Sequence, residues 1–183
     1  MYFVQKNDNI LWKMIQDKNG DDISKKILSI QDRCFQYYNL YKLPEMKYQL
    51  IHGDIHPQNI LKSKNSLYII DFDNISYFPA SYEILRFYFE LISNDLNNNQ
   101  NIEILNVLLK SYNDYHPLDN KEWDNSLYFY ISILLKDISM INNYEFISKR
   151  ILRAQFILDN QFIIENTIKT STRLGDFFNE IKI

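Results

Sequence analysis

Residues 51–60 read IHGDIHPQNI, and the run SLYIID follows at 66–71. The first stretch gathers two histidines, an aspartate, an asparagine, a proline and one of the three glycines of the chain. Side chains that bind metals or carry protons are therefore concentrated in one short segment, whereas the rest of the chain is rich in Ile, Asn and Tyr. Functional residues often lie in loops held by a rigid scaffold, so we expect this loop to be the functional site.

The segments on either side of this loop predict β-structure. YQLIH at 48–52 has the composition of a short strand that runs into the loop. Residues 59–61 are expected to be extended, KSKNS at 62–66 to form a polar turn, and SLYIID to form a second strand. We therefore predict a β-hairpin over 59–71.

The remaining chain predicts helices. Apolar residues recur at helical spacing in 21–38, 80–93, 102–115, 122–141 and 145–168, with polar or Asn-rich joints between most of these stretches. In the first of them the apolar positions are Ile23, Ile27, Ile30, Cys34 and Tyr38. The sequence thus predicts a single, mainly α domain over 1–183 with a small β-hairpin, and places the chemistry within 48–73.

Composition excludes several classes of function. A net charge of −3 does not favour nucleic acid or an anionic membrane as a partner, and no apolar run is long enough to span a bilayer. The single cysteine, Cys34, cannot form an internal disulfide, and the N-terminus lacks a signal-peptide pattern, so we expect a cytoplasmic protein. The glycines, at 20, 53 and 175, are too far apart for a glycine-rich phosphate loop.

The polar residues of the two quoted stretches suit phosphoryl transfer. Asp54 is followed five positions later by Asn59, and Asp71 ends the second predicted strand. Phosphoryl transfer needs a carboxylate to accept or orient the attacking hydroxyl, and Asn and Asp side chains to hold Mg²⁺ on the phosphates. Protein kinases use the same spacing from catalytic Asp to Asn, with an Asp-Phe pair after the next strand.

The combination of HGDxHPxN with IDFD resembles the aminoglycoside phosphotransferase/choline kinase superfamily, whose C-terminal lobe carries these motifs. The likeness covers residues 20–95 well. It implies that Asp54 is the catalytic aspartate and that Asn59 and Asp71 bind the metal. It also implies that Glu83, in Tyr82-Glu83-Ile84, braces the catalytic loop, although the family often has Asp there and Gly-Asp-Pro where this chain has Tyr77-Phe78-Pro79.

Further residues of the two segments are assigned from their chemistry. We expect Asp73 to bind a second metal ion or to be structural, and Gly53 to permit a backbone conformation or a close approach that a Cβ would prevent. His52 and His56 are assigned with Asn59 to cofactor binding; the alternatives are a loop-bracing hydrogen bond for His52 and packing under the loop for His56. The simplest expectation for Glu83 and Arg86 is an ion pair within one helix.

Three functions remain open. The first is a small-molecule kinase that moves the γ-phosphoryl group of ATP or GTP, with Mg²⁺, to a hydroxyl of an amino sugar, aminoglycoside, choline-like or related acceptor. The resemblance implies that the chain is the C-terminal lobe of a protein-kinase-like fold, and we expect the N-terminal, ATP-binding lobe to be absent. The second is a metal-dependent phosphoesterase. The third is a degenerate kinase lobe that binds a partner without turnover.

Overall fold

The computed structural model describes residues 46–93, 95, 96, 100–136 and 144–172, together with residues 22, 25–27, 29, 30 and 33. The chain divides into two compact units, Met1–Leu43 with Tyr128–Asn160 and Pro44–Leu127 with Gln161–Ile183. All residues assigned to the site from the sequence lie in the second of these units.

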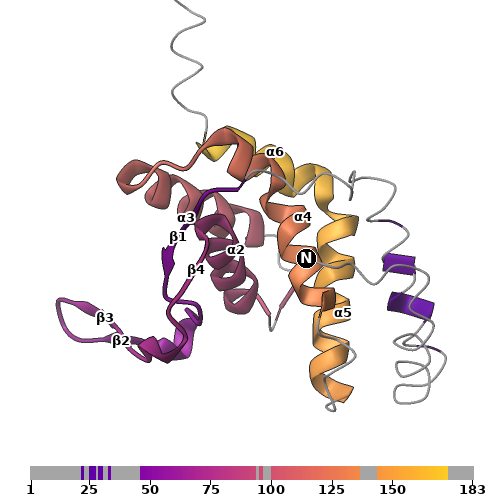
Figure 1. Cartoon of the computed structure of the whole chain (residues 1–183), viewed down its shortest axis with the longest axis horizontal. Coiled ribbons are helices and arrows are strands. Elements are labelled where there is room, and N and C mark those ends of the chain that lie inside the picture. The colour runs from indigo at the N-terminus through magenta and orange to yellow at the C-terminus, as the bar shows by residue number, and fades with distance from the viewer. Residues whose placement is uncertain are drawn as a thin grey trace, which may run out of the picture. The chain divides into compact units, whose positions relative to one another are not determined.

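The second unit contains two short antiparallel ribbons, one nested within the other along the chain (Figure 1). The outer ribbon pairs β1 (Tyr48–Ile51) with β4 (Ser76–Pro79), and the inner one pairs β2 (Ile60–Lys62) with β3 (Leu67–Ile69). Ile51 lies opposite Ser76, and Ile60 lies opposite Ile69. The two connecting segments, 52–59 and 70–75, are therefore held against each other between the ribbons.

A backbone hydrogen bond joins these two segments directly, because the Ile70 N–H donates to the Asn59 carbonyl at 3.0 Å. Each segment contains one turn of 3₁₀ helix, η1 (Pro57–Asn59) and η2 (Phe72–Asn74). The pairing thus brings the HGDIHPQN loop next to the residues that follow β3.

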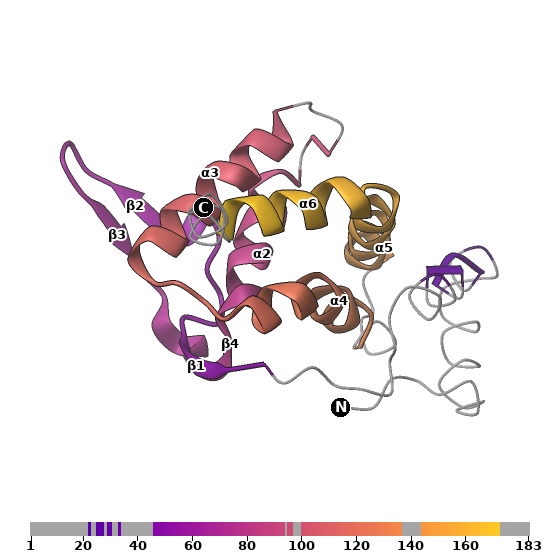
Figure 2. The same cartoon turned by 90° about the horizontal axis from the view of Figure 1, so that it is seen from above.

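Helices make up most of the rest of the described chain. They are α2 (Ala80–Leu91), α3 (Asn101–Tyr115), α4 (Asn120–Lys136), α5 (Tyr144–Asp159) and α6 (Gln161–Thr172). In the second unit α3 packs against both α2 and α6, as Figure 2 shows for α3 and α6. Ser171 Oγ donates to Asn106 Oδ1 at 2.7 Å, and Asn113 Nδ2 donates to the Thr172 carbonyl at 3.1 Å.

Each unit buries large apolar side chains. Fully or almost fully buried residues in the second unit are Leu85, Tyr88, Phe89, Leu105, Leu109 and Ile164. Those in the first unit are Ile27, Tyr130, Ile131, Ile147, Ala154 and Ile157. Burial of such side chains is the main favourable contribution to folding. In the second unit this core fixes helix α2, which borders the loop.

The start of α2 is held by a buried carboxylate from α4. Glu122 is only 1% exposed, and its Oε1 accepts a hydrogen bond from the Ser81 N–H at 3.1 Å. The first N–H groups of a helix have no acceptor within the helix, and the helix dipole favours negative charge at this end. Glu122 therefore stabilises the first turn of α2.

Replacing Glu122 by Ala is expected to lower the free energy of unfolding by about 2 kcal/mol, because the Ser81 N–H is left buried without an acceptor. Glu122→Gln retains a carbonyl oxygen and is expected to keep most of the stability. Chemical denaturation followed by circular dichroism measures both. An Ala variant as stable as the unsubstituted protein would show that this contact contributes nothing.

The structure confirms the mainly α composition and the hairpin predicted over 59–71. It adds a second ribbon that the sequence analysis did not predict, because β4 was not recognised before Pro79. The helical stretch predicted over 145–168 is two helices that separate at Asn160. Within 21–38, the described residues 22, 25–27, 29, 30 and 33 are helical, and the rest of that prediction, Cys34 included, lies outside the described residues.

No helix among the described residues is both long enough and apolar enough to cross a lipid bilayer.

Candidate active site

Glu83 holds the beginning of the loop from the first turn of α2. Its Oε2 accepts a hydrogen bond from the His52 N–H at 3.2 Å, and its Oε1 accepts one from the Gly53 N–H at 2.6 Å. Hydrogen bonds to an ionised carboxylate are stronger than those between neutral groups. Two consecutive peptide groups of the loop are thereby fixed to the helix.

Gly53 is required by both its conformation and its surroundings. Its φ is +81°, in the left-handed region that favours glycine. A Cβ at this position would lie 2.0 Å from the carbonyl oxygen of Asn74 and 2.9 Å from the carbonyl carbon. Because the obstacle is backbone, it cannot move aside as a flexible side chain would. The loop can approach η2 this closely only with glycine at position 53.

The His52 ring connects the loop to the segment after β3. Nε2–H donates to the carbonyl of Ile70 at 2.9 Å, and Nδ1 accepts a hydrogen bond from the Asp54 N–H at 3.3 Å. These partners require a neutral imidazole with its proton on Nε2. The ring also lies 4.6 Å from that of Phe72, centroid to centroid. Both ring nitrogens of His52 are therefore used by backbone groups.

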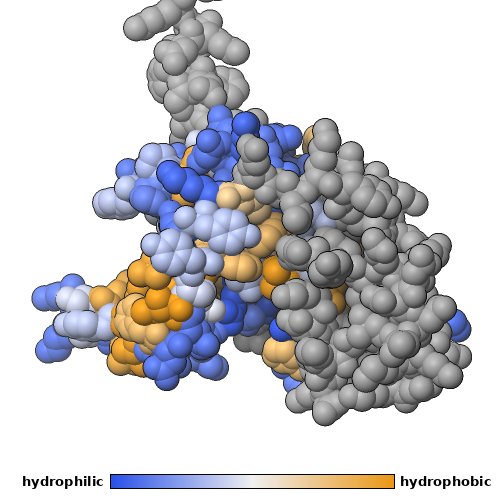
Figure 3. Space-filling model, in the orientation of Figure 1, coloured by the Kyte–Doolittle hydropathy of each residue, from blue (hydrophilic) through white to orange (hydrophobic). Residues whose placement is uncertain are grey.

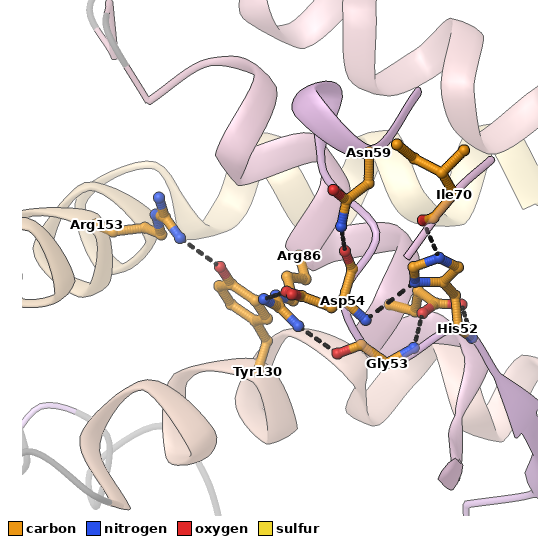
Figure 4. Close-up of polar contacts among 9 residues, drawn as sticks. His52, Gly53, Asp54, Asn59, Ile70, Arg86, Tyr130 and Arg153 are labelled. Atoms are coloured by element: carbon orange, nitrogen blue, oxygen red, sulfur yellow. Dashed lines mark hydrogen bonds and ion pairs between the residues drawn. The ribbon is translucent and has the colours of Figure 1, made fainter. Parts of the chain in front are cut away.

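Asp54 is held at three points (Figure 4). Its N–H donates to His52, its carbonyl accepts a hydrogen bond from Asn59 Nδ2 at 3.0 Å, and its Oδ1 forms an ion pair with Arg86 Nη2. The other carboxylate oxygen, Oδ2, has no hydrogen-bond partner among the described residues. The Asp54 side chain remains 26% exposed. The loop thus presents one free carboxylate oxygen in a defined position.

The hydrogen bond to the Asp54 carbonyl also orients the Asn59 side chain. The side chain is buried, at 7% exposure, and donation from Nδ2 to the Asp54 carbonyl turns its amide group in one direction. Within the described part of the chain, Oδ1 accepts no hydrogen bond. This amide oxygen is therefore available to a ligand or to water.

Asp71 has a strained backbone, with φ 66° and ψ 63°. It is the only described residue other than glycine with positive φ. Such strain often occurs at functional sites. The Asp71 carboxylate is exposed and pairs with no described residue, and Asp73, within η2, is likewise exposed. His56 is half-buried, and its side chain does not cap η1.

These residues provide the oxygen donors that Mg²⁺ prefers. The Asn59 amide oxygen and the Asp71 carboxylate lie on the two segments joined through Ile70, and both are free of protein partners among the described residues. In contrast, no three His, Cys, Asp or Glu side chains within the described residues are placed to hold a metal ion together. Asn59 and Asp71 thus offer oxygen donors of the kind that Mg²⁺ prefers, on two segments that are hydrogen-bonded to each other. For a two-metal phosphoesterase site, by contrast, His52 has no free nitrogen, because backbone groups use both of its ring nitrogens.

Arg86 was not assigned to the site from the sequence. The simplest expectation was an ion pair with Glu83, but Glu83 binds the loop backbone and Arg86 binds the Gly53 carbonyl and the Asp54 carboxylate. The two side chains are one helical turn apart, so they lie on the same face of α2. That spacing, together with the prediction that Glu83 faces the loop, is the signal that could have identified Arg86.

A second set of polar contacts joins β1 to α3. Gln49 Nε2 donates to Tyr112 Oη at 3.4 Å, and Gln49 Oε1 lies 3.1 Å from His116 Nε2. These two contacts connect β1 to the end of α3. Burial raises the pKa of Tyr112; the hydrogen bond with Gln49 lowers it, and the charges of Glu122 and Glu83 raise it further. Tyr112 thus lies within electrostatic range of the carboxylate that holds the loop.

Comparison with known proteins identifies a family. The model of the phosphotransferase enzyme family matches residues 10–119, a segment that contains the loop, both ribbons, α2 and α3. No curated protein and no solved structure matches the chain. The family match covers more than half of the chain, and it includes Asp54, Asn59, Asp71 and Glu83. The chain belongs to the phosphotransferase enzyme family, which is the aminoglycoside phosphotransferase/choline kinase superfamily recognised from its motifs.

Proposed function

We propose that this chain carries the catalytic, C-terminal-lobe part of a small-molecule kinase. The reaction transfers the γ-phosphoryl group of ATP or GTP to a hydroxyl of an amino sugar, aminoglycoside, choline-like or related acceptor. Family membership supports the reaction class. The arrangement of Asp54 supports the assignment of roles, because its N–H, carbonyl and Oδ1 are each held and Oδ2 is free.

In the proposed reaction Asp54 Oδ2 accepts the proton of the acceptor hydroxyl. The acceptor oxygen forms a bond to the γ-phosphorus while the bond from that phosphorus to the β–γ bridging oxygen breaks, so that the nucleoside diphosphate leaves. A general base contributes most when it is held within hydrogen-bonding distance of the proton that it removes. The three contacts of Asp54 provide this positioning before the substrate arrives.

Asn59 and Asp71 are the residues proposed to hold Mg²⁺, with Asp73 as a candidate for a second ion. Bound Mg²⁺ would neutralise charge on the phosphates of the nucleotide. The hydrogen bond from Asn59 Nδ2 to the Asp54 carbonyl ties the proposed metal ligand to the proposed base, so both are positioned by one contact. The Ile70 backbone is bound by both Asn59 and His52, which supports a shared role for Asn59 and the neighbouring Asp71.

Exposed apolar side chains flank this site and support a nucleotide partner. Leu61, Ile69, Ile70 and Phe72 are between 39% and 51% exposed, and Figure 3 shows hydrophobic surface beside the β2–β3 hairpin. Ligand pockets commonly combine apolar surface with a few well-placed polar groups. A nucleoside base packed on these side chains would leave its phosphates near Asn59 and Asp71.

The metal site is tested without turnover by adding Mn²⁺, a paramagnetic substitute for Mg²⁺, to the isotopically labelled protein. We expect the amide signals of 54–56, 58–60 and 70–73 to broaden first. Asp71→Asn is expected to weaken Mn²⁺ binding by about tenfold or more, since changes around a metal site commonly cost this much.

The matched control is Asp114→Asn, which removes an exposed carboxylate on α3 that has no hydrogen-bond partner among the described residues. This variant should bind Mn²⁺ as the unsubstituted protein does. Broadening confined to other acidic segments, or an unchanged affinity in Asp71→Asn, would remove the proposed metal site.

A further inference from the structure

Among the described residues, Arg86 is the side chain that contacts both the Gly53 carbonyl and the Asp54 carboxylate. From the middle of α2, its Nη1 donates to the Gly53 carbonyl and its Nη2 to Asp54 Oδ1. The planar guanidinium group therefore spans a backbone oxygen and a carboxylate oxygen on consecutive residues. Both partners of the ion pair are about three-quarters buried, with 26% of each side chain exposed.

We propose that Arg86 is a positioning residue for phosphoryl transfer: it holds Asp54 Oδ1 so that Oδ2 faces the acceptor hydroxyl. This inference rests on the proposed function. Without Arg86, the carboxylate of Asp54 can rotate about χ2 and exchange its two oxygens, although the backbone of Asp54 stays held by His52 and Asn59. With Arg86 bound, Oδ1 of Asp54 contacts the protein and Oδ2 is left for the substrate.

The spacing of Glu83 and Arg86 supports a shared role in setting the loop. One helical turn of α2 supplies a carboxylate that accepts from the N–H groups of His52 and Gly53. The next turn supplies a cation that donates to the Gly53 carbonyl and to Asp54. Opposite charges thus hold successive donor and acceptor groups of the loop, and only the arginine reaches the reactive side chain.

Lysine cannot replace this arrangement. Its ammonium group is a single point on a flexible stem, whereas guanidinium presents donors in a fixed plane that suits two-point contacts. Arg86→Lys therefore keeps the charge and loses the geometry. Because Arg86 is proposed to orient the Asp54 carboxylate and contacts none of the groups proposed to bind the nucleotide, the substitution should reduce kcat and leave KM for nucleotide and acceptor unchanged.

The experiment measures steady-state transfer from Mg·ATP to a panel of hydroxyl acceptors, using the full-length protein. We expect Arg86→Lys to lower kcat by about 100-fold, the effect of a small misplacement of a reacting group. KM should stay within about twofold, because ground-state binding is unaffected. Arg33→Lys, in an exposed ion pair with Asp159, is the matched control and should leave both constants unchanged.

Chemical rescue separates orientation from a general structural role. In Arg86→Ala, guanidinium ion at low millimolar concentration should restore part of kcat, whereas ammonium ion at the same concentration should not. An Arg86→Lys enzyme with normal kcat, a change confined to KM, or equal rescue by both ions would overturn the proposal. If Arg86→Lys keeps normal activity while Asp54→Asn is inactive, only the role of Arg86 is refuted. Asp54→Asn as active as the unsubstituted protein refutes the proposed function itself, because Asp54 is its proposed base.

Discussion

Asp54→Asn is expected to lower phosphoryl transfer by about 1,000-fold, within the range that a positioned general base contributes. The substitution is nearly isosteric. Its amide oxygen can still accept a hydrogen bond from Arg86, and its backbone contacts with His52 and Asn59 are unchanged. The amide nitrogen, however, cannot accept a proton where Oδ2 stood. Activity should therefore be lost while the fold is kept.

The measurement is release of nucleoside diphosphate in the presence of Mg·ATP and a panel of hydroxyl acceptors, with the thermal midpoint of each variant recorded in parallel. Asp114→Asn again serves as the control, because it removes the same charge from an exposed position on α3. Turnover by Asp54→Asn close to that of the unsubstituted protein would exclude Asp54 as the base.

Gly53→Ala is expected to reduce both stability and activity. The added Cβ would lie 2.0 Å from the Asn74 carbonyl oxygen, and alanine disfavours the φ of +81°. Strain of this kind costs about 3 kcal/mol when the structure cannot relax. Relaxation would pull Gly53 away from Glu83 and Arg86, so we also expect a fall of about 100-fold in turnover from misplacement of Asp54.

The origin of the clash can be tested, because it involves the backbone of Asn74 and not its functional group. Asn74→Ala alone should be close to the unsubstituted protein in stability. The double variant Gly53→Ala/Asn74→Ala should be as unstable as Gly53→Ala, since the carbonyl remains. Urea denaturation measures all three variants. Recovery of stability in the double variant would show that the Asn74 side chain causes the effect.

Local sequence patterns predicted many of the helices and strands. The spacing of apolar residues indicated α2, α3 and α4, and the polar turn at 62–66 indicated the inner hairpin, because these features depend on neighbours along the chain. The motif residues Asp54, Asn59 and Asp71 were assigned from their spacing and from the family resemblance. Their roles as base and metal ligands stay predictions, to be decided by the experiments above.

Other features depended on contacts between distant parts of the chain. The pairing of β1 with β4 joins residues about 30 positions apart, and no local pattern specifies which strand β1 meets. The approach of Asn74 to Gly53, which explains the glycine, follows from that pairing. Glu122 at the start of α2 is a similar case, since its partner Ser81 is 41 residues away.

The sequence by itself identified the family through its motifs and predicted the loop and most of the helices, because each of these depends on residues close together in the chain. Only the tertiary structure decided how the loop is held. Glu83 and Arg86 could have paired with each other, as two opposite charges one helical turn apart commonly do. Packing of α2 beside the loop instead offers Glu83 two N–H groups and gives Arg86 a carbonyl and the Asp54 carboxylate. Hydrogen bonds to loop groups that have few other partners outweigh an exposed ion pair, which contributes little in water.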